Sequence, residues 1–94
     1  MGNHNLTLQE IKILSVLEID DMYGYQILKE LGKKILLGSL YNTLKSMERK
    51  GYVESKWGED TGQGGRRKYY KITGQGEKVF EQAKSQLASI LKLA

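Results

Sequence analysis

The sequence predicts a winged helix-turn-helix, a mainly helical α+β fold with one β-hairpin, that ends in a C-terminal dimerisation helix. Three observations indicate it: three helical segments follow one another, two strand-like segments then flank a glycine-rich stretch, and the last helix repeats apolar residues at heptad spacing. With 94 residues the chain suffices for one domain with a modest core. We expect residues 1–75 to form a winged-helix DNA-binding domain, and residues 76–94 to add the dimerisation helix to the same structural unit.

The first helix is expected to run from about Leu8 to Ile19. Thr7 and Glu10 have the spacing of a capping box, in which each side chain accepts a hydrogen bond from the backbone of the other residue. Apolar residues occupy nearly the whole circumference of this helix, which is typical of a helix buried on more than one side. In so small a domain we expect a partner chain to cover part of that surface.

The second helix is expected from near Tyr23 to a C-terminal cap at Gly32. A third helix is expected to start near Gly38 or Ser39 and to be closed by Gly51. Its core stripe has the spacing i, i+4, i+7 and consists of Leu40, Leu44 and Met47. The two helices together form the helix-turn-helix unit, and the third is the recognition helix.

Residues 52–57 alternate in polarity and are expected to form a strand. Residues 58–65 contain four glycines and are expected to form the tip of the hairpin, and residues 67–72 the returning strand. Tyr70 is assigned to the core, and Thr73 to the N-cap of the last helix.

The last helix is expected from about Gly76 to near the end of the chain. Its apolar residues alternate between spacings of three and four, at Phe80, Ala83, Leu87, Ile90 and Ala94. Without a partner, much of this apolar surface would be exposed. The residues assigned to a homodimer interface come from the first and last helices: Ile13, Val16, Phe80, Ala83, Leu87, Ile90 and Leu91.

The charge distribution suggests a polyanionic partner. Fifteen Lys and Arg residues against eleven Asp and Glu give a net charge of +4, which decides little alone. Basic residues cluster, however, at residues 66–71, where two tyrosines accompany them, and again at residues 45–50. A solvated basic face is the alternative interpretation of these clusters.

The face of the recognition helix opposite its core stripe is rich in hydrogen-bond donors. Five residues share this face: Ser39, Asn42, Lys45, Ser46 and Arg49. We expect Asn42 and Ser46 to contact base edges in a major groove, and Lys45 and Arg49 to hold phosphates. Tyr41 flanks the face and is expected to contact either a phosphate or the core. An ordinary solvated helix face is the alternative.

The hairpin is expected to be a DNA-contacting wing. Glycines allow its tip to approach a backbone closely, and the bases that follow would grip phosphates or enter a minor groove. The residues assigned to this contact are Gly64, Arg66, Arg67 and Lys68. A flexible loop with solvated charges is the alternative.

Several classes of function are not expected. The chain contains no Cys, its one His is His4, and no nucleophile–base constellation or phosphate-binding loop is visible. We therefore expect no enzyme activity, no cofactor and no metal. No apolar run approaches the length of a membrane span, and the N-terminus does not have the pattern of a signal peptide, so a cytoplasmic protein is expected.

Three spaced motifs carry a resemblance to a known family. They are Tyr-Gly-Tyr-Gln-Ile at residues 23–27, Gly-Ser-Leu-Tyr-Asn-Thr-Leu at residues 38–44, and Gly-Arg-Arg-Lys-Tyr-Tyr at residues 65–70. In this order they resemble the PadR family, over about residues 6–82. The resemblance implies a dimeric winged-helix repressor, often of phenolic-acid or multidrug-resistance genes, whose C-terminal helix packs against the first helix of the partner. The chain departs from the family pattern at Leu36 and Leu37, where a small polar residue and Pro are usual.

The expected function is therefore sequence-specific binding of double-stranded operator DNA by a twofold dimer that represses transcription. The alternative is a winged-helix protein-interaction module that does not bind DNA. The sequence does not identify the operator, the regulated gene or a small-molecule inducer.

Overall fold

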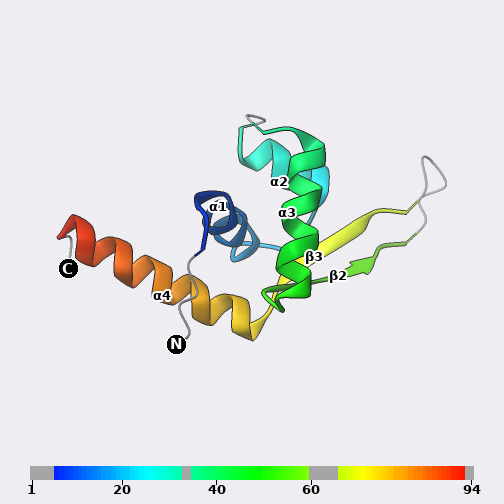
Figure 1. The fold of residues 1–94 in the computed structure, drawn as a ribbon. Helices are drawn as coiled ribbons and strands as arrows, with labels where there is room; N and C mark the ends of the chain where they lie inside the picture. Colours follow the sequence, from blue (N-terminus) through cyan, green and yellow to red (C-terminus); the bar gives the residue numbers. More distant parts are fainter. Residues whose placement is uncertain (1–5, 33–34, 60–65, 93–94) are drawn as a thin grey trace.

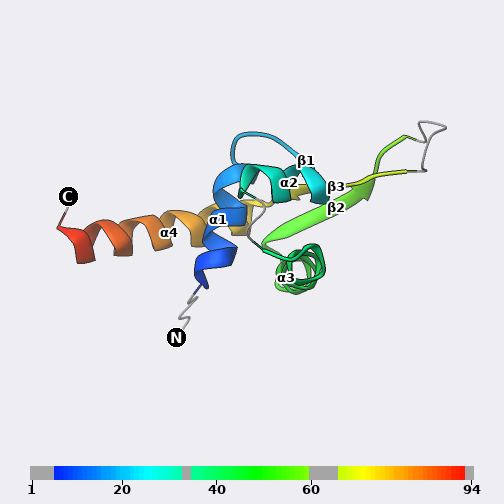
Figure 2. The ribbon, with the colours of Figure 1, turned by 90° about the horizontal axis from the view of Figure 1, so that it is seen from above.

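The chain folds as a winged helix with a projecting C-terminal helix (Figure 1). The computed structural model describes residues 6–32, 35–59 and 66–92. In chain order the elements are α1 (Leu8–Leu17), β1 (Met22–Tyr23), α2 (Gly24–Glu30), α3 (Leu37–Arg49), β2 (Val53–Trp57), β3 (Lys68–Ile72) and α4 (Gly74–Leu91). The β2–β3 hairpin and α4 extend from opposite sides of the helical body in both ribbon views (Figures 1 and 2). The expected α+β architecture is confirmed.

The predicted capping box starts α1. The Glu10 backbone N–H donates to Thr7 Oγ1 over 3.1 Å, and the Thr7 backbone N–H donates to Glu10 Oε1 over 2.9 Å. Glu10 is also almost fully buried, and its Oε2 accepts a hydrogen bond from Lys50 Nζ at 3.1 Å. This one carboxylate therefore joins the start of α1 to the end of α3. The helix ends at Leu17, two residues before the expected Ile19.

The sheet has three antiparallel strands in the order β1–β3–β2, one strand more than the hairpin that the sequence predicts. The additional strand, β1, consists of two residues, of which Met22 pairs with Tyr70 and Tyr23 with Tyr69. In the hairpin, Val53 pairs with Ile72 and the register continues to the pair formed by Trp57 and Lys68. Tyr70 is buried, as expected.

The glycines predicted to end helices do so. Gly32 and Gly51 have φ angles of +83° and +84°, which lie in the left-handed region that glycine adopts most readily. Between them, α3 begins at Leu37, one residue before the expected start, and no side chain caps it. The core stripe of α3, Leu40, Leu44 and Met47, is fully buried.

The start of α4 is packed against the body of the domain. Thr73 Oγ1 accepts a hydrogen bond from the Gly76 backbone N–H at 3.0 Å and donates one to the Gly51 carbonyl oxygen at 2.5 Å. Val79 and Phe80 belong to the hydrophobic core. Past these residues α4 leaves the body (Figure 1). The helix begins at Gly74, two residues before the position expected from the sequence.

Part of the expected dimer interface lies inside the protomer's own core. Ile13 is 0% exposed, Phe80 4% and Val16 9%. Ile13 therefore has no exposed surface to offer a second chain, and Val16 and Phe80 offer very little. The apolar circumference of α1 is covered by α2, α3, β3 and α4 of the same chain. The large apolar side chains of α1 and its C-terminal flank that are exposed are Leu8 and Ile19.

Across the described residues, none of the helices combines the length and the apolar character that crossing a membrane requires.

Candidate nucleic-acid interface

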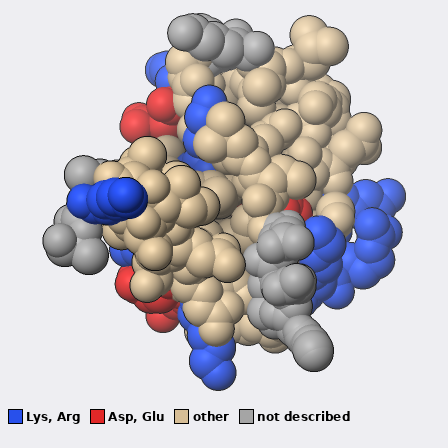
Figure 3. All heavy atoms as spheres, turned by 60° about the vertical axis from the view of Figure 1, so that its left-hand side comes forward, with Lys and Arg blue, Asp and Glu red and all other residues tan. Residues whose placement is uncertain are grey.

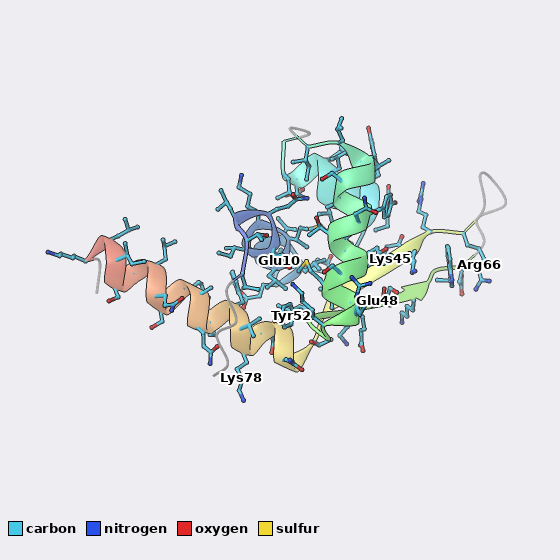
Figure 4. The ribbon with its side chains drawn as sticks, in the orientation of Figure 1. Glu10, Lys45, Glu48, Tyr52, Arg66 and Lys78 are labelled. Carbon is cyan, nitrogen blue, oxygen red and sulfur yellow. The ribbon has the colours of Figure 1, made fainter. Side chains whose placement is uncertain are left out.

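Two stripes of side chains cover the outer half of α3. The first has the spacing i, i+3, i+7, i+10 and consists of Ser39, Asn42, Ser46 and Arg49. All of these are exposed except Ser46, which is half-buried. The second has the spacing i, i+4, i+7 and consists of Tyr41, Lys45 and Glu48, which face the hairpin. Lys45 and Glu48 can be followed in Figure 4, where both project from α3 on the hairpin side.

The second stripe forms one wall of a hollow between α3 and the hairpin, called here the cleft. Its volume is about 590 Å³. Residues of β1, α3 and the two hairpin strands, together with Arg66 and Arg67 just before β3, line it: Tyr23, Tyr41, Lys45, Glu48, Trp57, Arg66, Arg67, Lys68 and Tyr70. The cleft thus brings the expected wing residues Arg66, Arg67 and Lys68 opposite Tyr41 and Lys45 of the recognition helix. The remaining wing residue, Gly64, lies outside the described residues.

Aromatic rings hold two of the cleft's cations in place. The Arg67 guanidinium carbon lies 4.6 Å from the centroid of the Tyr23 ring. The Tyr23 ring in turn makes a T-shaped contact with the Tyr69 ring, with 5.5 Å between the two ring centroids. Lys68 Nζ lies 5.6 Å from the centroid of the Trp57 ring. Cation–π contacts position a cation without neutralising its charge, so both remain available to an anion.

No ion pair engages these cations within the described parts of the chain. Arg66 donates from Nε to the Gly58 carbonyl oxygen at 3.3 Å, which leaves its charge unpaired. The ion pairs that the described residues do form join Lys50 to Glu10 and Lys84 to Glu81, away from the cleft lining. The cleft therefore presents four cations, Lys45, Arg66, Arg67 and Lys68, against one carboxylate.

That carboxylate, Glu48, was not among the site residues expected from the sequence. Its Oε2 accepts a hydrogen bond from Ser55 Oγ at 2.6 Å, so it links the last turn of α3 to β2. Burial, and secondarily the charges of Tyr41 and Glu48, raise the pKa of the Tyr70 phenol above its ordinary value of 10.0. Tyr70 is therefore a neutral hydroxyl at physiological pH. The helical spacing from Tyr41 and Lys45 to Glu48 is the signal that could have identified this residue.

Tyr41 lies against the start of α2. A Cβ atom at Gly24 would overlap the Tyr41 hydroxyl and would stand 2.7 Å from its Cε1 atom. The absence of a side chain at Gly24 thus makes room for the ring. From the sequence, Tyr41 was expected to contact either a phosphate or the core. In the structure its side chain is partly exposed and lies on the wall of the cleft.

A second surface is apolar and lies at the other end of the molecule. On α4, Leu87 is 51% exposed, Ile90 75% and Leu91 54%. Figure 3 shows the face from which α4 comes forward, and its centre is mainly uncharged, with most charged side chains toward the edges. Ala83, one heptad step earlier, is half-buried.

A winged helix with an exposed polar recognition helix and a basic hairpin defines a regulator of the helix-turn-helix class. The chain belongs to the transcriptional regulator PadR-like family, whose pattern matches residues 13–82. The chain is therefore a transcriptional regulator of that family.

Solved structures of the same class support the assignment. A PadR family transcription regulator from Clostridium difficile R20291 is 36% identical, with a TM-score of 0.84 over 93% of this chain and 94% of that one. A transcriptional regulator from Clostridium thermocellum is 34% identical, with a TM-score of 0.76 over 89% and 86% of the two chains. A PadR-like transcriptional regulator from Bacillus cereus is 27% identical, with a TM-score of 0.77 over 89% and 84%.

Proposed function

We propose that the chain is a sequence-specific DNA-binding repressor that acts as a homodimer on a palindromic operator. The observation that carries this proposal is the set of four cations in the cleft, none of which forms an ion pair with another described residue, beside the polar stripe of α3. Duplex DNA offers phosphates and base-edge acceptors at matching positions. A protein-interaction module has no comparable need for an unpaired basic cleft.

The two stripes of α3 are suited to different parts of the DNA. Asn42 and Ser46, on the first stripe, are suited to base edges, and Arg49 at the end of that stripe is suited to a phosphate. Ser39, in the first turn, stands where recognition helices contact bases. Lys45 faces the cleft and would hold the DNA backbone from the helix side.

The hairpin holds the backbone from the other side. Arg66, Arg67 and Lys68 are suited to phosphates that flank the major groove. These contacts carry no sequence information, so they supply affinity and register.

The exposed apolar surface of α4 is suited to a second copy of the chain. Burying a side chain such as Leu87 contributes about 1.5–3 kcal/mol, and Ile90 and Leu91 lie on the same half of the helix. Leu8 and Ile19 supply the exposed apolar surface of α1 and its flank that the partner's α4 would cover. Twofold pairing would place the recognition helices about one DNA turn apart, or roughly 34 Å, which matches a palindromic site.

Selection of bound sequences from a random DNA pool tests the DNA-binding proposal. We expect a palindromic consensus, and an operator affinity that falls linearly with the logarithm of salt concentration. A protein that enriches no sequence and whose weak DNA binding does not respond to salt would instead be a protein-interaction module.

Sedimentation of a double variant tests the dimer. Leu87→Glu with Ile90→Glu should give monomers with native helical content and much weaker operator binding, because two charges would have to be buried at the interface. Gln86→Glu with Ser89→Glu adds the same charge at exposed polar positions of α4 and should remain dimeric. An apolar-to-Glu variant that sediments as a dimer would contradict the assigned interface.

A further inference from the structure

The start of α3 exposes two large apolar side chains. Leu36, the N-cap residue, is 80% exposed, and Leu37, the first residue of the helix, is 41% exposed. Leu36 stands three residues before Ser39, where the first stripe begins, and Leu37 stands four residues before Tyr41, where the second stripe begins. Each stripe of the recognition helix is therefore preceded by an exposed leucine.

Neither helix capping nor the core accounts for Leu36. An N-cap side chain stabilises a helix by accepting a hydrogen bond from a backbone N–H of the first turn, and Leu36 makes no such bond. An apolar side chain contributes to the core in proportion to the area that it buries, and Leu36 buries little. The first turn of α3 also has no acidic residue that would repel a polyanion. The surface of Leu36 is therefore available to a partner.

Gly38, in the same turn, is a second residue that the fold does not require. Its backbone is helical, and the described glycines with positive φ angles are Gly32 and Gly51. A Cβ atom added at Gly38 would have no described atom within 4 Å, so no neighbour excludes a side chain there. Glycine inside a helix is less favourable than alanine, because it loses more conformational freedom on folding. The missing side chain instead lets another molecule come close to the backbone of this turn.

The exposed leucines match one feature of duplex DNA. In helix-turn-helix regulators the N-terminal residues of the recognition helix contact base edges, and thymine presents an apolar 5-methyl group in the major groove. From these observations we propose that Leu36, with Leu37 beside it, contacts thymine methyl groups, and that Gly38 lets the backbone of the turn come close to the bases. This contact rests on the proposed function, because it belongs to the same DNA interface, and it adds the identity of a base that the helix recognises.

Uracil in place of thymine tests the methyl contact, because the two bases differ only in this group. The operator selected from the random pool should contain thymine in each half-site. Replacing its thymines by uracil should weaken binding of the full-length wild-type protein by about tenfold in fluorescence anisotropy titrations, because each half-site loses a buried methyl group. Leu36→Ala should bind the two operators with similar affinity, close to that of the wild type for the uracil operator.

Asn42→Ala is the control, because it removes a polar group that is assigned to a base edge. This variant should bind both operators more weakly and should keep the preference for thymine over uracil. Leu36→Ala should match the wild type in urea unfolding and in sedimentation, because the side chain that it shortens is exposed. A preference for thymine that survives in Leu36→Ala would refute the contact. A Leu36→Ala variant that sediments as a monomer would assign Leu36 to the dimer interface instead.

Gly38→Ala tests the close approach of the backbone. It should unfold at the same or a higher urea concentration, yet bind the operator at least about tenfold more weakly, because the added methyl group would stand between the turn and the bases. Gly74→Ala adds the same group at an exposed and open position of α4 and should bind normally. Normal operator binding by Gly38→Ala would refute the close approach.

Failure of this contact and failure of the proposed function give different results. A wild-type protein that selects an operator but binds its thymine and uracil forms equally, or that selects half-sites without thymine, refutes the thymine contact alone. A protein that enriches no sequence and shows no salt-sensitive DNA binding refutes the proposed function, and the thymine contact with it.

Discussion

Replacing Gly24 with Ala should move Tyr41 out of the cleft wall with little loss of stability. The added methyl group would overlap the Tyr41 hydroxyl and stand 2.7 Å from the ring's Cε1, closer than real Cβ contacts, so one of the two groups must shift. Among the described glycines, those with positive φ are Gly32 and Gly51, so the backbone at Gly24 accepts Ala without strain. The Tyr41 ring is partly exposed and can rotate into solvent.

The expected magnitudes separate binding from stability. Ala is favoured over Gly within a helix by roughly 0.5–1 kcal/mol, which offsets most of the partial burial that the Tyr41 ring loses. The free energy of unfolding should therefore change by less than about 1 kcal/mol. We propose that the Tyr41 hydroxyl contacts a DNA phosphate, so its displacement should weaken DNA binding by about tenfold, which corresponds to roughly 1.4 kcal/mol.

A double-mutant cycle tests the mechanism, with urea unfolding and fluorescence anisotropy as the assays. Gly24→Ala in a Tyr41→Ala background should cause no further loss of DNA affinity, because the ring through which it acts is absent. Gly74→Ala is the matched control, since Gly74 is also the first residue of its helix but has no atom within 4 Å of the added Cβ. The proposed coupling between Gly24 and Tyr41 is refuted if Gly24→Ala unfolds the protein, or if it binds DNA normally while Tyr41→Ala does not.

Three further substitutions have defined outcomes. Gly76→Ala should lower the free energy of unfolding, measured by urea denaturation, by more than about 2 kcal/mol. The added Cβ would overlap the Tyr52 carbonyl oxygen, a backbone atom that cannot rotate away. A variant as stable as the wild type would show that α4 can shift to make room. Arg66→Ala with Arg67→Ala should weaken binding to operator and random DNA alike, and should reduce the slope of log affinity against log salt concentration by about 0.9 per lost phosphate contact. An unchanged slope would exclude the hairpin from the DNA interface. Asn42→Ala should reduce the difference in binding free energy between operator and random DNA by about 1–3 kcal/mol in competition titrations. An unchanged difference would mean that other residues contact the bases.

The features that the sequence predicts correctly are local ones. The capping box of Thr7 and Glu10, the cap at Thr73 and the closing glycines Gly32 and Gly51 each depend on groups a few residues apart. Such signals are complete in a short window of sequence, whatever the rest of the chain does. The order of helices and hairpin strands therefore followed from the sequence.

The features that the sequence missed depend on contacts between distant segments. Met22 and Tyr23 form a strand because β3 pairs with them, and two residues carry no periodicity of their own. The helical pattern of α1 predicts that the apolar side chain of Ile13 is buried, but it does not indicate whether the same chain or a partner chain covers it. In the structure four elements of the same chain surround α1, which leaves no need for a partner at that position.

The candidate site was predicted in the same uneven way. Arg66 and Arg67 were assigned to the wing from local composition, and the structure places them in the cleft. Tyr23 and Trp57 line the same cleft, yet nothing near them in the sequence indicates that β1 and β2 meet α3 there. Glu48 was indicated only by its helical spacing from Tyr41 and Lys45.

The buried carboxylate of Glu10 has a consequence for the operator itself. It joins the start of α1, which the proposed partner helix approaches at Leu8, to Lys50 at the end of the recognition helix. In the proposed dimer, the angle between the dimer axis and α3 would therefore be held by a contact inside each protomer. Such a dimer would tolerate few inserted or deleted base pairs between the two halves of its operator. Each added pair rotates one half-site about the DNA axis, whereas the two recognition helices would keep their relative orientation.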